Sequence, residues 1–198
     1  YSKARGLKGR TLGIVGLGRI GYEVARRAKA FEMTVIYSDV VAHAQFECEL
    51  GLTRVELKNL LAECDFLTLH VPGGTQTRHM IGEEELALLK PTAFVINCCR
   101  GGVVDEAALA RAVQRGDIAG AALDVYEAEP GASDTEFHDP VGKIPQVYGT
   151  HHVGASTEQA QNAIADEVVR ITRTFMQTGD VRNCVSIPGV PTLTHSGT

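Results

Sequence analysis

The sequence predicts an α/β fold in which an open, doubly wound parallel sheet carries helices on both faces. Three observations predict it. Short apolar runs alternate with segments of helical spacing, the first run leads into a glycine-rich turn, and that turn opens a helix. Runs that are apolar at both alternating positions are typical of strands covered on both faces.

The expected strands are short apolar runs bounded by glycine, proline or polar residues. In chain order they are Thr11–Gly16, Met33–Asp39, Phe66–Val71, Ala93–Cys98, Ile118–Val125 and Gln146–Thr150. Apolar residues at helical spacing predict the helices Arg19–Phe31, Leu57–Ala62, Glu83–Leu89, Asp105–Gln114 and Thr157–Gln177. Asp105 is the expected cap of its helix, with Gly116 as its stop, and Gly179 ends the last helix.

The length of 198 residues suits one large domain with appendages. We expect residues 9–180 to form that domain. Residues 1–8 are expected to be a linker, and residues 181–198 a C-terminal segment or tail.

Composition excludes several function classes. The net charge is -5, with 19 Lys and Arg against 24 Asp and Glu and no dense basic run, which argues against binding of nucleic acid or an anionic membrane. No apolar run approaches the roughly 20 residues that span a bilayer. Five cysteines without a CxxC pair favour reduced thiols in a cytoplasmic protein and no metal site.

The strongest local signal is the turn GLGRIG after the first strand. Gly16 permits the tight turn, Gly18 lets the backbone approach a pyrophosphate, and Gly21 allows the helix to pack closely on the strand. Asp39 ends the second strand, where a carboxylate can accept hydrogen bonds from ribose hydroxyls. Because Val40 and Val41 offer no Arg for a 2′-phosphate, the expected cofactor is NAD rather than NADP.

The reacting groups are sought at the carboxyl ends of the strands, where doubly wound sheets bind ligands. Arg100 follows a strand and precedes two glycines, a position suited to clamping a carboxylate. The pair His151-His152 offers a proton acceptor, but chemistry alone does not choose between the two imidazoles.

Other titratable residues have a plainer interpretation. We expect His43, His79 and His138 to be surface residues, and His70 to be packed or next to the cofactor. The adjacent thiols of Cys98 and Cys99 are interpreted as buried and structural, since no further metal ligand lies near them in sequence.

Five ordered blocks of the sequence resemble the NAD-binding domain of the D-2-hydroxyacid dehydrogenases. The blocks are GLKGRTLGIVGLGRIG, HVPGGTQTRHMI, NCCRGGVVDEAAL, GAALDVYEAEP and HHVGASTEQAQ. The last block and GDVRNCVSIPGV are most similar to the D-3-phosphoglycerate dehydrogenase branch. This resemblance implies a homodimer and a small 2-hydroxy acid as substrate, namely 3-phospho-D-glycerate oxidised to 3-phosphohydroxypyruvate in serine biosynthesis.

The resemblance also implies roles for individual residues. Arg100 would hold the substrate carboxylate, Glu129 would support the catalytic histidine, and His152 would be the acid/base, although His151 stands where the family usually has proline. The implied nicotinamide contacts are Cys98, Cys99, Asp124, Gly154 and Ala155. The implied contacts to adenosine and phosphates are Arg19, Ile20, Asp39, Val71 and Pro72.

Two alternatives to phosphoglycerate oxidation stay open. One is another D-2-hydroxyacid dehydrogenase, such as a glyoxylate or hydroxypyruvate reductase, and the other is a non-catalytic, NAD-responsive protein resembling the corepressors of this family. The family's substrate domain has no counterpart before Tyr1, so we expect the chain alone to bind NADH with little or no turnover.

Overall fold

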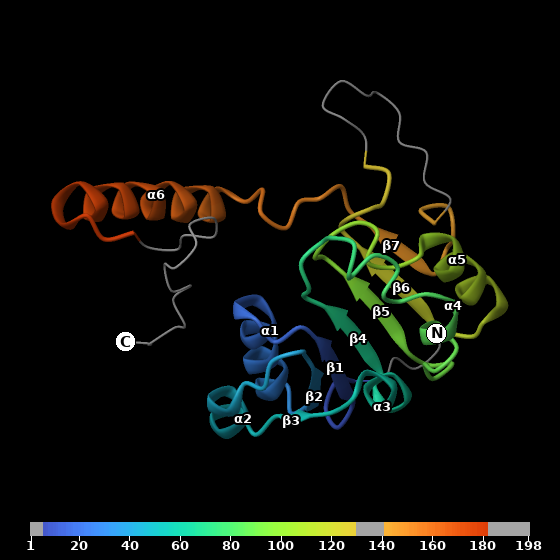
Figure 1. Ribbon diagram of the computed structural model, residues 1–198. Coiled ribbons are helices and arrows are strands. Elements are labelled where there is room, and N and C mark those ends of the chain that lie inside the picture. The colour runs from blue at the N-terminus through green and yellow to red at the C-terminus, as the bar shows by residue number, and fades with distance from the viewer. Residues whose placement is uncertain (1–5, 130–140, 182–198) are drawn as a thin grey trace. The chain divides into compact units, whose positions relative to one another are not determined.

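A seven-stranded parallel sheet forms the centre of the first of two compact units in this chain (Figure 1). The computed structural model describes residues 6–129 and 141–181. The two units are residues 1–152 and residues 153–198. The expectations for His138, for most of residues 1–8 and for residues 182–198 lie outside the described residues.

The strand order is that of a doubly wound sheet, as the sequence predicts. The strands are Thr11–Val15 (β1), Thr34–Ser38 (β2), Thr53–Arg54 (β3), Phe66–Leu69 (β4), Phe94–Asn97 (β5), Gly120–Leu123 (β6) and Val147–Gly149 (β7). They lie in the order β3-β2-β1-β4-β5-β6-β7, and each neighbouring pair is parallel. The order changes direction between β1 and β4, and such a point is where these sheets bind ligands.

Five helices connect the strands of the first unit. They are Arg19–Ala30 (α1), Ala44–Leu50 (α2), Leu57–Glu63 (α3), Glu83–Leu86 (α4) and Glu106–Arg115 (α5). The caps predicted for α5 are confirmed: Asp105 accepts a hydrogen bond from the backbone N–H of Ala108, and Gly116 ends the helix with φ +76°. Helix α4 is shorter than predicted, because Leu88 and Leu89 donate to carbonyls three residues back and so tighten the chain into a turn.

Helix α2 and strand β3 were not predicted, and their burial explains why. No residue of α2 is buried, and both residues of β3 are exposed. Neither segment therefore carries the apolar pattern from which the other elements were predicted.

The two faces of the sheet carry separate hydrophobic clusters. Leu12 and Ile14 of β1 pack with Ala25 of α1, whereas the other face of the sheet packs against α3, α4 and α5. Gly13 faces α3, and a Cβ there would lie 2.6 Å from Cδ2 of Leu60. The absence of a side chain at this position lets α3 approach the strand closely.

Over residues 153–181, the part of the second unit that the structure describes, the chain forms one long helix, Glu158–Thr178 (α6). The hydroxyl of Thr157 accepts from the backbone N–H of Ala160 at 3.2 Å, and Gly179 ends the helix with φ +71°. These ends agree with the prediction. Among the described residues, no helix combines the length and the apolar character that crossing a membrane requires.

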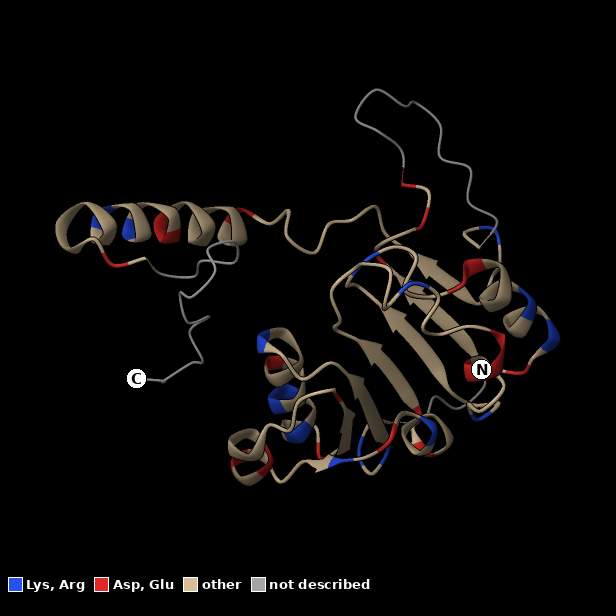
Figure 2. Ribbon diagram, in the orientation of Figure 1, with Lys and Arg blue, Asp and Glu red and all other residues tan. Residues whose placement is uncertain are grey.

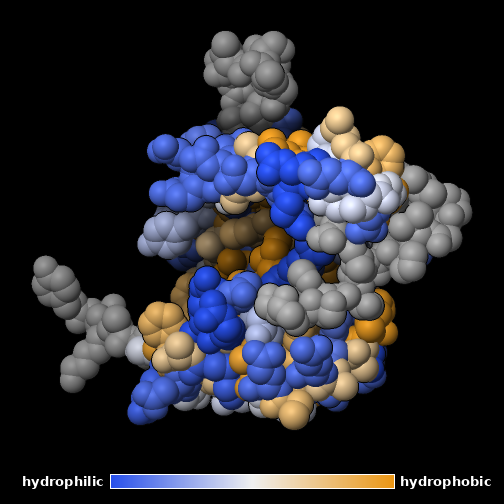
Figure 3. Space-filling view, turned by 90° about the vertical axis from the view of Figure 1, so that its left-hand side faces the viewer, coloured by the Kyte–Doolittle hydropathy of each residue, from blue (hydrophilic) through white to orange (hydrophobic). Residues whose placement is uncertain are grey.

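Oppositely charged residues pair on the exposed side of two helices of the first unit. The acidic residues of α4 face basic residues of α5 (Figure 2), with Glu83 3.1 Å from Arg111 and 3.4 Å from Arg115. All three side chains are about half exposed, and pairs of this kind are worth roughly 0–1 kcal/mol each. Hydrophilic residues also predominate on the face in Figure 3, where apolar residues are interspersed among them.

Candidate active site

The glycine-rich turn joins β1 to α1 at the carboxyl end of the sheet. Gly16 has φ +89°, and a Cβ on it would lie 2.6 Å from the carbonyl oxygen of His70. A Cβ on Gly21 would lie 2.3 Å from the carbonyl oxygen of Gly16. Both positions therefore need glycine for the turn itself, before any ligand is considered.

Gly18 differs from these two glycines. It is the N-cap of α1, its φ is -72°, and a Cβ on it would meet no atom within 4 Å. Open space thus lies beside the first turn of α1, where Arg19 and Ile20 begin the helix. The backbone N–H groups and the dipole of a helix N-terminus favour an anion at such a place.

Asp39 links the second strand to this turn. Its Oδ2 accepts from the backbone N–H of Leu17 at 2.7 Å, and its Oδ1 accepts from the backbone N–H of Val41 at 2.9 Å. A carboxylate has about four acceptor positions, so the two backbone donors do not exhaust its capacity to accept. The carboxylate is anchored beside the glycine-rich turn and can still accept hydroxyl donors.

These features fit a dinucleotide. The open space at Gly18 and the start of α1 suit a pyrophosphate, and the Asp39 carboxylate suits a ribose diol. Exposed apolar side chains border the same residues: Ile20 is 69% exposed, Val40 96% and Val41 56%. Such side chains suit contact with the flat, apolar faces of an adenine.

Two further residues, whose contacts the sequence did not predict, lie next to Asp39. The imidazole Nε2 of His43 lies 3.4 Å from Asp39 Oδ2, and its ring stacks on Phe46. The guanidinium of Arg54 donates to the backbone carbonyl of Asp39. The interpretation of His43 as a plain surface residue was wrong, because its side chain is 25% exposed and packs within the turn after β2.

Val71 and Pro72 follow β4, next to the glycine-rich turn. The carbonyl of Pro72 accepts from the hydroxyl of Thr77 at 2.7 Å. His70, at the end of β4, contacts the hydroxyl of Thr68 at 3.1 Å, and burial lowers the pKa of its imidazole. His70 is thus packed and favours its neutral form, as expected.

The histidine and the carboxylate predicted to act together are in contact. His152 Nδ1 lies 2.9 Å from Glu129 Oε2, and Glu129 Oε1 accepts from the backbone N–H of Tyr126 at 3.1 Å. His152 has φ +59°, which is uncommon outside glycine and is typical of residues constrained at functional sites. Geometry therefore distinguishes the two imidazoles: His152, rather than His151, is held by Glu129.

Arg100 lies on the adjacent loop after β5. Its Nη1 donates to the carbonyl of Cys99 at 2.6 Å, and within the described residues it makes no hydrogen bond or ion pair with Glu129 or His152. A Cβ on Gly101 would lie 1.8 Å from the carbonyl oxygen of Tyr126. Glycine at this position lets the loop of Arg100 cross directly over the segment that leads to Glu129.

Asn97 is a further residue to which the sequence alone assigned no role. It is 2% exposed, its Nδ2 donates to the carbonyl of Arg100 at 3.0 Å, and its Oδ1 accepts from the backbone N–H of Cys99 at 3.1 Å. An amide that bonds both sides of a loop fixes its shape. The sequence signal was present, since Asn side chains commonly bond backbone groups two or three residues away in turns.

The predicted nicotinamide contacts of the first unit lie around the ends of β5 and β6. Asp124 is 5% exposed and accepts from the hydroxyl of Thr150 at 2.6 Å. Desolvation by the surrounding protein and the charge of Asp124 raise the pKa of the Cys98 thiol, although the residue as a whole is exposed to solvent, and desolvation raises the pKa of Cys99. Cys98 is exposed, so its interpretation as a buried thiol was wrong. Gly154 and Ala155 belong to the second unit.

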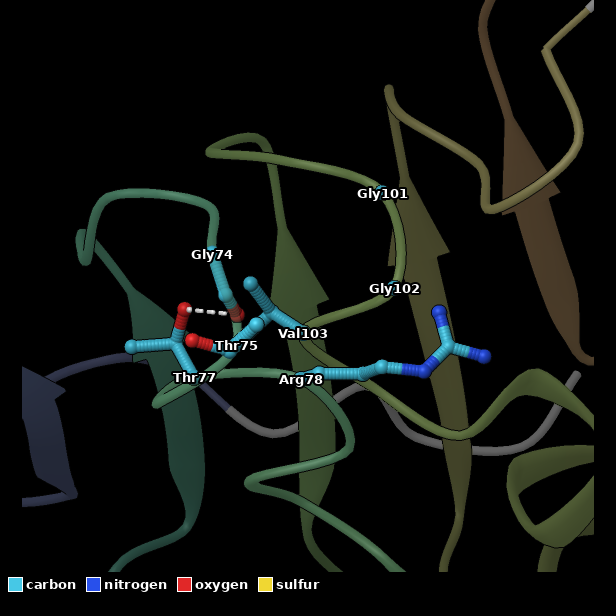
Figure 4. A pocket seen from close by; sticks show the side chains of 7 residues that line it. All are labelled: Gly74, Thr75, Thr77, Arg78, Gly101, Gly102 and Val103. Atoms are coloured by element: carbon cyan, nitrogen blue, oxygen red, sulfur yellow. Dashed lines mark hydrogen bonds between the residues drawn. The ribbon is translucent and has the colours of Figure 1, made fainter.

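A cavity of about 270 Å³ lies between the loops that follow β4 and β5 (Figure 4). Its lining residues are Gly74, Thr75, Thr77, Arg78, Gly101, Gly102 and Val103. Beside it, Glu127 pairs with Arg78 and contacts His79 Nε2 at 3.0 Å, and these two partners lower the pKa of Glu127, His79 most. We expected His79 to be a plain surface residue, and this was wrong. Its imidazole contacts Glu127 and so links the loop after β4 to the segment before Glu129.

Comparison with known proteins identifies the family. Residues 1–154 match the model of "D-isomer specific 2-hydroxyacid dehydrogenase, NAD binding domain". The chain belongs to this family. NAD is accordingly the cofactor of this 2-hydroxyacid dehydrogenase domain.

Relatives of this 2-hydroxyacid dehydrogenase domain include phosphoglycerate dehydrogenases and glyoxylate reductases. It is 42% identical over 186 residues to D-3-phosphoglycerate dehydrogenase of Methanocaldococcus jannaschii, covering 93% of the chain and 34% of that protein. It is 46% identical over 165 residues to glyoxylate reductase of Thermococcus litoralis, covering 83% of the chain and 48% of that protein. The chain thus spans between a third and a half of these relatives' length.

Solved structures agree on the architecture. The NAD-complexed D-isomer specific 2-hydroxyacid dehydrogenase of Lactobacillus delbrueckii ssp. bulgaricus has a TM-score of 0.81 at 34% identity, covering 89% of this chain and 56% of that one. A glyoxylate reductase from Paecilomyes thermophila has a TM-score of 0.79 at 36% identity, covering 89% and 52%. The doubly wound fold predicted for this 2-hydroxyacid dehydrogenase domain is confirmed.

Proposed function

We propose that this domain supplies the cofactor site and the acid/base pair of an enzyme that oxidises 3-phospho-D-glycerate to 3-phosphohydroxypyruvate, the entry to serine biosynthesis. The contact of His152 Nδ1 with Glu129 Oε2 at 2.9 Å carries the proposal. An imidazole held by a carboxylate is the arrangement that acid/base catalysis requires, and we therefore place an enzyme ahead of a protein that only senses NAD. We also propose a cytoplasmic homodimer.

The His152–Glu129 pair is arranged for proton transfer. With Nδ1 engaged by the carboxylate, Nε2 is left to accept the proton of the substrate hydroxyl. The charge of Glu129 stabilises the imidazolium that forms, and its second oxygen is held by the backbone of Tyr126, which fixes the orientation of the pair. NAD, when bound, would supply the acceptor for the hydride that leaves the substrate carbon.

Arg100 is proposed to hold the substrate carboxylate. Its guanidinium is exposed and presents a planar set of donors that matches a carboxylate. The Asn97 side chain fixes the backbone on both sides of the loop that presents it. To bind substrate, Arg100 exchanges its bond to the Cys99 carbonyl for bonds to the ligand.

The cofactor is proposed to lie across the carboxyl end of β1, with its pyrophosphate at Gly18, Arg19 and Ile20 and its adenosine ribose at Asp39. Val71 and Pro72 would border the phosphates. Cys98, Cys99 and Asp124 of the first unit would contact the nicotinamide.

A glyoxylate reductase is the second candidate. The glyoxylate reductase of Korarchaeum cryptofilum is 48% identical to this chain over 81% of its length, whereas the phosphoglycerate dehydrogenase of Methanocaldococcus jannaschii matches 93% of it. The wider coverage by the phosphoglycerate dehydrogenases, 93% of the chain against 83% for the glyoxylate reductase of Thermococcus litoralis, favours phosphoglycerate as the substrate.

The test compares substrates in the full-length gene product. We expect NAD-dependent oxidation of 3-phosphoglycerate with a kcat/KM well above that for reduction of glyoxylate. The His152→Gln and Glu129→Gln variants should lose turnover while NADH binding, measured by calorimetry, is retained. Full turnover in the His152→Gln variant would refute the proposed role, and a preference for glyoxylate would establish the second candidate.

A further inference from the structure

A permanent cation lies against the backbone of Asp39, the residue expected to bind the cofactor's adenosine ribose. Nη2 of Arg54 lies 2.7 Å from the backbone carbonyl oxygen of Asp39, and Nε lies 3.2 Å from the same oxygen. Nη2 also approaches the carbonyl oxygen of Val40 at 3.5 Å. The guanidinium thus holds the turn whose first residue presents the ribose-binding carboxylate.

The fold brings Arg54 there from a different strand. Tyr37 of β2 and Arg54 of β3 are partners in the parallel register, so both strands end at the same edge of the sheet. Dinucleotide sites that accept a 2′-phosphate generally have an Arg near the acidic position. The two residues that follow Asp39 in sequence are valines. The Arg that lies beside Asp39 is Arg54, which is fifteen residues further along the chain.

The guanidinium has donors to spare. Arg carries five N–H donors, and the contacts with the two carbonyls occupy Nε and Nη2. Within the described residues, Nη1 makes no hydrogen bond or ion pair, and the residue is exposed. A phosphate placed beside the turn could therefore pair with Arg54 without breaking the bonds that hold Asp39.

We infer that Arg54 is a specificity-determining residue of the cofactor site: it is the group that would bind the 2′-phosphate of NADP(H), and the Asp39 carboxylate prevents it from doing so. The inference rests on the dinucleotide site proposed above. The Asp39 carboxylate repels a phosphate in the same space, so NADH is preferred. Removing that one charge should leave a cationic phosphate site already in place.

The test measures binding to the chain itself rather than turnover. Calorimetry with NADH and NADPH is carried out on the unchanged protein and on the Asp39→Asn, Arg54→Met and Asp39→Asn/Arg54→Met variants. Adenosine 2′,5′-bisphosphate and 5′-AMP serve as fragment probes that isolate the 2′-phosphate. The control is Lys8→Met, which removes one cation from an exposed ion pair with Glu32. Lys8 precedes β1 and Glu32 precedes β2, so the pair lies at the amino ends of these strands, away from Asp39.

We expect Asp39→Asn to raise the affinity for NADPH relative to NADH at least tenfold, and Arg54→Met to abolish that gain in the double variant. Lys8→Met should change neither affinity more than twofold. Equal NADPH affinity of the single Asp39→Asn variant and the double variant would overturn the inference. Failure of the unchanged protein to bind NADH would refute the dinucleotide site itself, which is a distinct result.

Loss of structure is separated from loss of recognition by thermal unfolding of each variant. Asp39→Asn forfeits one of the two backbone hydrogen bonds of the carboxylate. Asp39→Ser therefore serves as a second variant with a smaller side chain. A folded Asp39→Ser variant that gains no affinity for NADPH would count against Arg54 as the phosphate ligand.

Discussion

The glycine-rich turn allows ligand binding to be separated from folding by two substitutions of the same size. Gly18→Ala adds one methyl group where no atom lies within 4 Å and where φ is -72°, a value that alanine adopts freely. Alanine is a poorer N-cap than glycine, but it also restricts the unfolded chain, and these effects of up to about 1 kcal/mol oppose each other. The unfolding free energy should therefore change by less than about 1 kcal/mol.

The added methyl group nevertheless fills the space proposed for the pyrophosphate. We expect the Gly18→Ala variant to bind NADH at least tenfold more weakly than the unchanged chain, as measured by calorimetry. Gly21→Ala is the matched comparison. Its methyl group would lie 2.3 Å from the Gly16 carbonyl oxygen, where ordinary contacts begin at 3.4 Å. Forcing atoms apart in a packed site costs about 1–3 kcal/mol, which urea unfolding can measure.

The pair of variants gives a clear refutation. If Gly18→Ala binds NADH as tightly as the unchanged chain, the pyrophosphate does not lie against this turn. If Gly18→Ala unfolds as readily as Gly21→Ala, the space beside the helix is not open, and the assignment of separate roles to the two glycines is wrong.

Three further predictions follow from the site. His152→Gln in the full-length gene product should lower kcat by about 10²–10⁴-fold, the usual contribution of a general acid or base, and an unchanged kcat would contradict that role. Asn97→Ala should lower the unfolding free energy by about 1–3 kcal/mol in urea titrations, because the buried side chain loses two hydrogen bonds to the loop. An unfolding free energy equal to that of the unchanged chain would show that these two bonds do not stabilise the loop. Burial lowers the pKa of His70 in the folded chain, so the unfolded chain binds its proton more readily. The free energy of unfolding is therefore not reduced by His70 above about pH 6.5, and it falls as the pH drops below that value and the unfolded chain takes up the proton. Urea unfolding between pH 5 and 8 should show this loss, and His70→Gln should reduce it; an unchanged slope would exclude His70 as its source.

The sheet could be predicted from the sequence because its central strands are buried. Ile14 and Val95 lie within runs that are apolar on both faces, and such runs leave little choice of structure. Strand β3 could not be predicted in the same way, since both of its residues are exposed and it is held by backbone pairing with β2. Its position depends on the rest of the sheet rather than on its own side chains.

The candidate site was predictable where its chemistry is local. Gly16, Gly18 and Gly21 stand within one turn, and the structure gives each a separate steric environment. The approach of Arg54 to Asp39 was not predictable, because it depends on the register of two strands. The chemistry of the sequence likewise did not decide which of the two adjacent histidines is the proton acceptor. In the structure it is His152 that contacts Glu129.

The most direct test of the cofactor site is a crystal structure of the chain grown with NADH. The account predicts that the pyrophosphate lies at the N-terminus of α1 beside Gly18, and that the adenosine ribose donates its hydroxyls to Asp39. A dinucleotide bound elsewhere on the chain, with the glycine-rich turn and Asp39 free of it, would contradict the account.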